Sequence, residues 1–308
     1  MIKLIQPIGF CYGVRNSIKK AKEERRNSPK RKIVFLHPIV HNRKTHEELL
    51  KEVHGEDYDP SADPKIYDNA VIVTSAHGST AEEKRLVHYL KGELLDCTCP
   101  FLITAKKTMK AYLEEGYDVY FVGNEKHAET LSVLSSDPRI IYIPTSKALS
   151  FDFKSIREGA KIAVFPQSTL SRTVYESFLS SLRKSVNVSS LKIFPLCHEC
   201  ANRWDAALKI PPEERFSFFV IGDPTSSNAR EFVSLVSRNY PNMKVFLTSD
   251  ADELAQQMKE IDFRDNVYLA SATSASADQV RAVYKRLKKE NRKQRFLRFL
   301  RVLCFHKS

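Results

Sequence analysis

The stretch VYFVGNEKHAET, residues 119–130, joins a buried strand, a turn and the start of a helix. Its first half is almost entirely apolar, as the strands of a parallel sheet are when both faces are covered. Its second half is polar and leads into a helical pattern. Because ligands bind outside the carboxyl ends of parallel strands, His127 and Glu129 stand where a functional site is expected.

Apolar runs of this kind recur, with helical segments between them. Strands that alternate with helices predict an α/β protein with parallel sheets. The expected strands lie near residues 32–36, 70–75, 117–123, 139–143, 161–165, 216–222, 243–247 and 266–271. The expected helices cover residues 13–26, 43–53, 80–92, 101–116, 170–184, 199–208, 228–238, 250–260 and 276–293.

Breaks in this pattern divide the chain into three α/β pieces of similar length and indicate a pseudo-threefold arrangement. They fall at Cys11, at residues 96–100, at residues 185–195 and after about residue 280. The Pro- and Asp-rich residues 55–69 predict a long surface loop. The predicted domains are residues 12–98, 99–195 and 196–282, followed by a basic C-terminal tail, 283–308.

Composition restricts the possible functions. The net charge is +12, but residues 281–308 hold eleven Lys/Arg and one Glu, whereas the remaining 280 residues hold 38 basic and 36 acidic groups. A nearly neutral body argues against a nucleic-acid-binding groove. The chain has 9 glycines and neither a G-x-G-x-x-G nor a P-loop pattern, so a dinucleotide or P-loop site is not expected.

The sequence also bears on location. No apolar run approaches the roughly 20 residues that cross a bilayer. The start, MIKLIQPIGFCYGVRNS, lacks the long apolar region of a secretory signal. We therefore expect a cytoplasmic protein with reduced thiols, in which clustered cysteines favour metal binding or catalysis over disulfides.

Histidine, serine and asparagine follow several expected strands. Side-chain donors at a helix N-terminus form an anion site, so this recurrence predicts a phosphate or diphosphate ligand. The alternative is that Ser226, Ser227 and Asn228 only cap a helix.

Glu129 is the one carboxylate at H-x-E spacing to such a histidine, and a carboxyl beside an anion has a raised pKa that suits a proton donor. A helix-dipole role is its alternative. The other residues at strand ends are His37, His41, His77, Gln167, Ser168, Thr169, Ser271, Thr273, Ser274 and Ser276.

Five of the six cysteines fall at the breaks, and three interpretations remain open. Cys97, Cys99, Cys197 and Cys200 form a plausible four-cysteine zinc set. The C-x-x-C pair alone is compatible with a thioredoxin-like dithiol. One thiolate from each break would instead hold an iron–sulfur cluster with one iron open to substrate.

The motifs GFCYGVRNSI, HPIVHN, SAHG, TCP, HAE, QSTLS, NRW and SSN occur here in a characteristic order. Together they resemble the 4-hydroxy-3-methylbut-2-enyl diphosphate reductases, the LytB/IspH family, over about residues 3–285. The resemblance implies a trefoil of three α/β domains around a central [4Fe-4S] cluster, with a ferredoxin- or flavodoxin-type electron donor. The resemblance implies that the cluster is bound by Cys11, Cys99 and Cys197. It implies that protons are supplied by Glu129 and Ser168. It also implies that the diphosphate is bound by His41, His77, His127, Ser226, Ser227, Asn228 and either Ser274 or Ser276.

The chain departs from the family pattern at several positions. Cys200 replaces a usual threonine and Cys97 a usual alanine, and the family's TAGAS reads SATSAS. An altered-substrate or non-catalytic iron–sulfur or zinc paralogue, acting as a sensor, is therefore the alternative function. For Cys200 there are two interpretations: it lies near the cluster and caps or protects the open iron, or it is a small buried residue of a helix. The tail, residues 285–306, combines Lys/Arg with Phe and Leu, so it predicts either weak membrane contact or a helix packed on the body.

Overall fold

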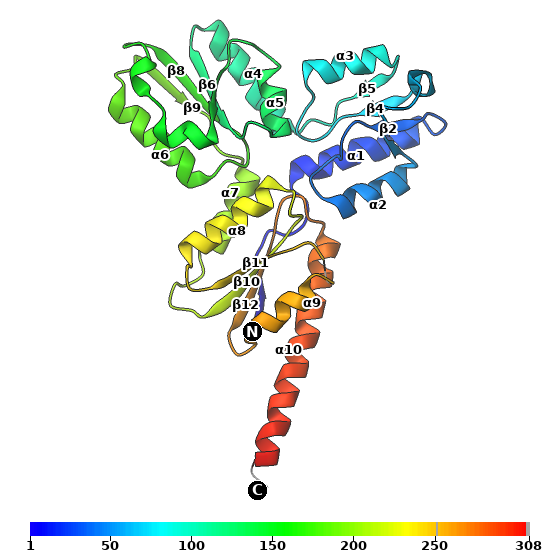
Figure 1. Ribbon diagram of the computed structural model, residues 1–308, viewed down its shortest axis with the longest axis vertical. Helices are drawn as coiled ribbons and strands as arrows, with labels where there is room; N and C mark the ends of the chain where they lie inside the picture. Colours follow the sequence, from blue (N-terminus) through cyan, green and yellow to red (C-terminus); the bar gives the residue numbers. More distant parts are fainter. Residues whose placement is uncertain (251, 306–308) are drawn as a thin grey trace. The chain divides into compact units, whose positions relative to one another are not determined.

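The computed structural model describes the backbone of residues 1–250 and 252–305, and their side chains up to residue 299. It contains three four-stranded sheets, in which neighbouring strands run parallel (Figure 1). The α/β prediction is therefore confirmed. The sheet orders are β3-β2-β4-β5, β7-β6-β8-β9 and β1-β12-β10-β11.

Strands and helices alternate along most of the chain. The strands are β1 (Ile2–Leu4), β2 (Ile33–Phe35), β3 (Glu56–Asp57), β4 (Val71–Val73), β5 (Glu93–Leu95), β6 (Asp118–Gly123), β7 (Ile141–Pro144), β8 (Lys161–Pro166), β9 (Ser190–Ile193), β10 (Phe216–Ile221), β11 (Lys244–Thr248) and β12 (Asn266–Ser271). The α-helices are α1 (Tyr12–Asn27), α2 (Arg43–Val53), α3 (Ala81–Tyr89), α4 (Pro100–Glu114), α5 (Ala128–Leu134), α6 (Arg172–Ser185), α7 (His198–Ala207), α8 (Ser227–Asn239), α9 (Leu254–Gln257) and α10 (Ala277–Phe305).

Four strands were not predicted from the sequence, namely β1, β3, β5 and β9. Each lies at the edge of its sheet and spans two to four residues, so none has a long apolar run. The predicted break at 185–195 contains β9, and the predicted loop at 55–69 contains β3 and one 3-10 turn. The predicted helix 250–260 is only α9 and a 3-10 turn, whereas α10 continues beyond the predicted end at 293.

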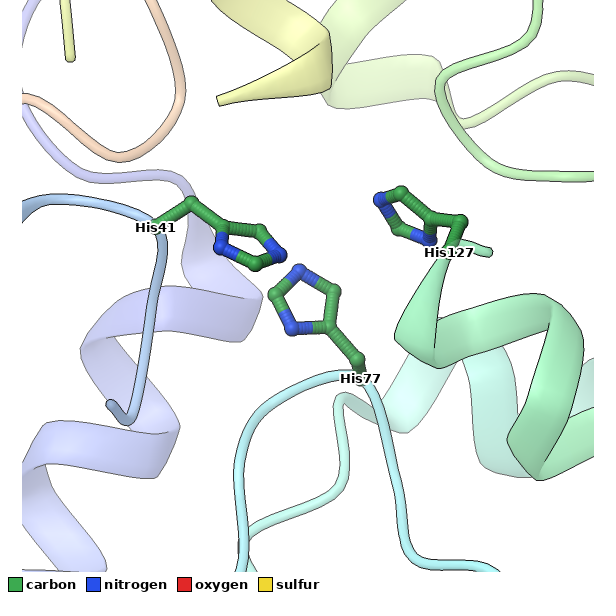
Figure 2. Close-up of side chains that lie close together, drawn as sticks. All are labelled: His41, His77 and His127. Atoms are coloured by element: carbon green, nitrogen blue, oxygen red, sulfur yellow. The ribbon is translucent and has the colours of Figure 1, made fainter. Parts of the chain in front are cut away.

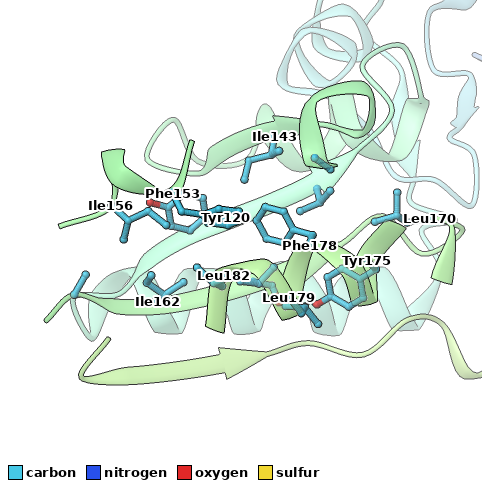
Figure 3. Close-up of a cluster of buried hydrophobic side chains, with 14 residues drawn as sticks. Tyr120, Ile143, Phe153, Ile156, Ile162, Leu170, Tyr175, Phe178, Leu179 and Leu182 are labelled. Atoms are coloured by element: carbon cyan, nitrogen blue, oxygen red, sulfur yellow. Dashed lines mark hydrogen bonds between the residues drawn. The ribbon is translucent and has the colours of Figure 1, made fainter. Parts of the chain in front are cut away.

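The sheet formed by β6–β9 illustrates why its central strands are so apolar. On β6, Tyr120 and Val122 face a core covered by α6, which contributes Phe178 (Figure 3). Val119 and Phe121 face the opposite core, covered by α4 and α5. Successive side chains of a strand point to opposite faces, so a sheet covered on both sides needs apolar residues at every position.

The chain divides into two compact units. Unit 1 comprises Met1–Cys11 and Glu199–Ser308, and unit 2 comprises Tyr12–His198. Unit 1 holds one sheet, because β1 pairs with β12, while unit 2 holds the other two. The domain boundaries at residues 98, 195 and 282 stay a prediction. The segment predicted as a tail begins inside α10, whose Val283 and Leu287 lie in the core of unit 1.

The two central strands of every sheet lead to the predicted site residues. In the sheet formed by β6–β9, the chain moves outward from β6 to β7 on one side and from β8 to β9 on the other. The same divergence separates β2 from β4. Such a switch in strand order leaves a crevice at the carboxyl ends, where ligands bind in open α/β sheets. The topology therefore places a candidate site at these ends.

Candidate functional site

Three histidines of unit 2 lie close together, as predicted, and Figure 2 shows their rings converging from separate loops. The ring centroids of His41 and His77 are 4.6 Å apart. The His127 ring lies 5.8 Å from the first and 5.3 Å from the second. One nitrogen from each ring falls within 4.8 Å of the others. This group can donate several hydrogen bonds to one small ligand.

Local backbone features hold these histidines in place. His41 directly precedes Asn42, which caps α2 by accepting a 3.0 Å hydrogen bond from the Thr45 amide. His77 precedes Gly78, which adopts a φ of +85°, and a Cβ there would overlap the Ser132 hydroxyl. His127 itself caps α5. Each histidine is therefore fixed near a turn or a helix N-terminus, where anions are favoured.

Burial and mutual proximity set the protonation of the histidines. The pKa of His77 is lowered well below its usual value because burial disfavours the imidazolium and because the other histidines of the group would repel it. His127 Nδ1 accepts the Glu129 amide at 3.2 Å, so in the neutral ring Nε2 carries the proton. His77 is therefore a neutral N–H donor at neutral pH.

Glu129 and Ser168, the predicted proton donors, are in direct contact. Ser168 donates from its hydroxyl and its backbone amide to the Glu129 carboxylate, at 2.5 and 2.7 Å. Glu129 is 4% exposed. Its pKa is raised because burial penalises the carboxylate, although the two hydrogen bonds from Ser168 and the charge of Lys106 act in the opposite direction. A buried carboxyl linked to a hydroxyl can pass a proton to a neighbouring oxygen.

Two further residues contribute to this region. Gln167 was predicted only as a polar residue at a strand end, and Lys106 was not predicted. Gln167 accepts the Asn124 amide at 2.8 Å and so joins the loops that follow β6 and β8. Lys106 of α4 donates to Ser132 at 2.6 Å, and burial lowers its pKa to about 8. Nothing in the sequence distinguishes Lys106 from its neighbour Lys107, because only the tertiary structure buries one of them.

His37, which also follows β2, has a different environment. It contacts the Glu83 carboxylate at 2.6 Å, and its side chain is 58% exposed. The hydrogen bond with Glu83 raises the pKa of His37. It therefore forms a surface pair, whereas its neighbour in sequence, His41, belongs to the cluster.

In unit 1, the predicted Ser226, Asn228 and Ser274 are buried near the start of α8. Ser226 caps α8 by accepting the Ala229 amide at 3.3 Å, and the Ser274 hydroxyl lies 3.4 Å from the Ser226 hydroxyl. Asn228 accepts the Thr273 amide at 2.9 Å. These contacts bring the segments after β10 and β12 together at the N-terminus of α8, where the first amides have no partner within the helix.

The remaining two predicted serines are engaged differently. Ser276 accepts the Gln279 amide at 3.1 Å, and the Gln279 side chain accepts the Ser276 amide at 2.8 Å, which is a reciprocal cap of α10. The Ser227 hydroxyl accepts from Arg230 at 3.3 Å. Of the two alternatives left by the SATSAS segment, Ser274 is the one beside Ser226.

Each predicted cluster cysteine directly precedes a helix. Cys11 comes before α1, Cys99 before α4 and Cys197 before α7. A helix N-terminus favours a thiolate or another anion. The Cys99 amide also donates to the Ala76 carbonyl at 2.9 Å, which ties it to the His77 turn, and the Cys11 amide donates to the Thr273 carbonyl at 3.0 Å.

The two additional cysteines have partners within their own units. Cys97 is completely buried, and its thiol donates to the Ser17 carbonyl at 3.6 Å. The sulfur of Cys200 accepts a hydrogen bond from the Asn228 amide group at 3.1 Å. These contacts favour packing and positioning roles over the four-cysteine zinc set.

Arg203, within the NRW motif, is a buried residue whose importance only the structure reveals. Its guanidinium donates to the carbonyl oxygens of Pro7, Gly9 and Ser271 and to the Ser271 hydroxyl, at 2.6 to 3.1 Å. It therefore fixes the segment that leads to Cys11. Arginine suits this task because its planar fork reaches several acceptors at once.

Solved structures share this α/β fold. A solved structure titled E-1-hydroxy-2-methyl-but-2-enyl-4-diphosphate reductase from Plasmodium falciparum matches with a TM-score of 0.77 and 23% identity, over 91% of this chain and 86% of that one. A structure titled (E)-4-hydroxy-3-methyl-but-2-enyl diphosphate reductase, the terminal enzyme of the non-mevalonate pathway, matches with a TM-score of 0.64 and 21% identity, over 94% and 99%.

The sequence comparisons identify the family. A family model described as LytB protein matches residues 2–288, so the chain belongs to the LytB family. Among curated relatives, the 4-hydroxy-3-methylbut-2-enyl diphosphate reductase of Nitratiruptor sp. is 28% identical over 84% of this chain and 88% of that protein. The protein of the same name from Neorickettsia sennetsu is 28% identical over 92% and 90%. The family resemblance predicted from the motifs is confirmed.

Within the described residues, no helix combines the length and the apolar character that crossing a membrane requires. The cytoplasmic location stays a prediction.

Proposed function

We propose that this protein reduces 4-hydroxy-3-methylbut-2-enyl diphosphate to isopentenyl and dimethylallyl diphosphates. The reaction uses two electrons and two protons and releases the C4 hydroxyl as water. Support comes from membership of the LytB family and from the names of the relatives. The observation that carries the proposal is the buried Glu129 carboxyl, hydrogen-bonded to Ser168 and adjacent in sequence to the histidine cluster.

The proposed cofactor is a [4Fe-4S] cluster held by Cys11, Cys99 and Cys197. The donor set suits it, because three thiolates that each precede a helix N-terminus would be stabilised by the partial positive charge there. When bound, such a cluster supplies electrons, and the iron without a cysteine ligand serves as a Lewis acid.

The histidines and the Ser/Asn group have the task of binding the diphosphate. His41, His77 and His127 offer ring N–H donors, and Ser226 and Asn228 add donors at the start of α8. Binding energy from the diphosphate, which does not react, would orient the hydroxyl end of the substrate.

Glu129 and Ser168 have the task of proton delivery. The raised pKa keeps a larger fraction of Glu129 protonated near neutral pH than an exposed glutamic acid would have. Ser168 would relay this proton to the departing oxygen, since its hydroxyl can accept one hydrogen bond and donate another. The leaving group is then water, a far better leaving group than hydroxide.

Electrons have to come from outside the chain. The sequence has no G-x-G-x-x-G pattern for a nicotinamide or flavin dinucleotide. The proposed electron donor is therefore a small carrier protein of the ferredoxin or flavodoxin type. The proposed location of the enzyme is the cytoplasm.

The C-terminal helix is a proposed site of weak membrane contact. Among the side chains of α10 described up to residue 299, the last buried one is Leu287, whereas Phe296 and Phe299 are each 60% exposed. Aromatic side chains beside Lys and Arg suit an anionic bilayer surface. Sedimentation with anionic vesicles, with and without residues 290–308, tests this, and equal binding of both forms would rule it out.

Anaerobic purification followed by turnover tests the main proposal. We expect a brown protein that contains iron and acid-labile sulfide and that consumes the substrate when a chemical reductant is present. A colourless zinc protein without turnover would support the alternative of a non-catalytic sensor. A cluster-containing protein that binds inorganic diphosphate but leaves this substrate intact would indicate an altered substrate.

A further inference from the structure

A chain of buried polar contacts within unit 1 connects three segments that are distant in sequence. Cys200 of α7 accepts a hydrogen bond from Asn228 Nδ2 at 3.1 Å. Asn228 Oδ1 accepts the Thr273 amide at 2.9 Å and lies 3.3 Å from the Thr273 hydroxyl. The Thr273 carbonyl in turn accepts the Cys11 amide at 3.0 Å. Asn228 is 4% exposed and Cys200 is 3% exposed.

These contacts determine which way the Asn228 side-chain amide points. Only its oxygen can accept the Thr273 N–H, so its NH₂ group has to face Cys200. One hydrogen of that group goes to the sulfur, and the other can be donated to a ligand oxygen. A carboxamide held at both ends is pre-organised, because its rotation is already restricted before a ligand arrives.

Burial makes the sulfur important for this arrangement. A buried N–H that loses its acceptor keeps the full cost of its desolvation, so the carboxamide would rotate or shift to recover a partner. A movement of Asn228 would displace the donor that faces the ligand. The Cys200 side chain therefore acts through Asn228 and has no need to touch the substrate.

We propose that Cys200 is a positioning residue whose sulfur holds the Asn228 carboxamide ready to bind the diphosphate. This rests on the proposed function in one respect, namely that Asn228 contacts the diphosphate. Cys200 then has a role distinct from a cap on the open iron. It links the diphosphate-binding start of α8 to α7, the helix that begins directly after Cys197.

Two variants of equal shape separate hydrogen bonding from packing. Cys200→Thr keeps an acceptor, whereas Cys200→Val replaces it with a methyl group of similar size. We expect Cys200→Val to raise KM and to weaken binding of inorganic diphosphate about tenfold, the effect of one lost hydrogen bond. Its kcat should stay within about twofold, and Cys200→Thr should bind diphosphate within about threefold of the parent protein.

Two controls complete the experiment. Cys97→Val alters another buried cysteine, whose thiol donates to the Ser17 carbonyl, and should leave KM unchanged. In an Asn228→Ala background, Cys200→Val should have no further effect on diphosphate affinity, because the two residues act as one. Iron and sulfide contents are measured for every variant and should equal those of the parent.

The possible outcomes distinguish this proposal from the proposed function. Equal KM values for Cys200→Thr and Cys200→Val, or additive effects with Asn228→Ala, would overturn the positioning role. If the parent protein binds inorganic diphosphate but does not reduce the substrate, the proposed function fails, while the order of diphosphate affinities still supports or contradicts the role of Cys200.

Discussion

The two candidate ligand-binding regions use different chemistry. In unit 2 the donors are the imidazoles of His41, His77 and His127, accompanied by a buried carboxyl with a raised pKa. In unit 1 the donors are hydroxyls, a carboxamide and the amides at the start of α8. His77 and Glu129 of the first region have shifted pKa values, whereas the hydroxyls and the carboxamide of the second stay neutral at every ordinary pH. We therefore expect the pH dependence of ligand binding and turnover to arise in unit 2.

The largest effect should come from Glu129. Replacing it with Gln removes the proton donor but keeps the side-chain shape, so we expect kcat to fall by roughly 10²- to 10⁴-fold. Affinity for inorganic diphosphate and iron content should remain unchanged. Steady-state kinetics with a chemical reductant measure the loss, and Ser168→Thr, which keeps the hydroxyl, should retain far more activity than Ser168→Ala. A fully active Glu129→Gln would remove Glu129 from the mechanism.

The next effect concerns His77, whose pKa is lowered by burial and by the neighbouring histidines. A bound diphosphate would raise that pKa, since negative charge favours the imidazolium. Binding should then take up protons, and affinity should strengthen as the pH falls, by up to about tenfold per pH unit for one proton. Calorimetry in buffers with different ionisation enthalpies measures this uptake. His77→Asn should weaken binding roughly 10- to 100-fold and diminish the uptake; an unchanged uptake would contradict the assignment.

A smaller effect should separate a ligand-binding cap from a purely structural one. Ser226 caps α8 and Ser276 caps α10, so alanine at either position should cost about 1 kcal/mol of the free energy of unfolding. Only Ser226→Ala should also weaken diphosphate binding, by roughly fivefold and equally at pH 6 and pH 8. Denaturant unfolding and calorimetry measure the two quantities. Weaker binding in Ser276→Ala instead would reverse the assignment of these serines.

The smallest effect concerns Lys106, whose positive charge lowers the pKa of Glu129. Lys106→Met should raise that pKa further, because the carboxylate loses its nearby cation. The pH at which kcat declines on the basic side should therefore move upward, with kcat at pH 7 changed by less than about threefold. Lys107→Met is the matched exposed control. A shift to lower pH in Lys106→Met would contradict the electrostatic role.

The sequence could predict the class of fold and most candidate residues for a local reason. Buried central strands such as β6 and β8 appear as continuous apolar runs, and the polar residues after them mark the carboxyl ends. Edge strands such as β3 are too short and too exposed to leave this pattern. The sequence also predicted too early an end for α10, because no side chain described after Leu287, up to residue 299, is buried and so no apolar stripe indicates the helix there.

Other features depended on contacts between distant parts of the chain. Lys106 and Lys107 are adjacent and chemically identical, yet only Lys106 meets Ser132. Likewise, SATSAS offers several serines, and packing against the start of α8 selects Ser274 as the neighbour of Ser226. Sequence spacing cannot reveal such pairs, because their separation along the chain does not determine their separation in space.

By itself, the sequence determined the parallel α/β architecture, the family and the residue types of the candidate site, since all of these follow from local patterns of polarity and from motif order. Only the tertiary structure decided which groups are buried together: the carboxyl of Glu129 with Ser168, the three imidazoles with one another, and the sulfur of Cys200 with Asn228. Burial removes water, and in its absence the choice of neighbour sets the pKa of each group and the direction of each hydrogen bond.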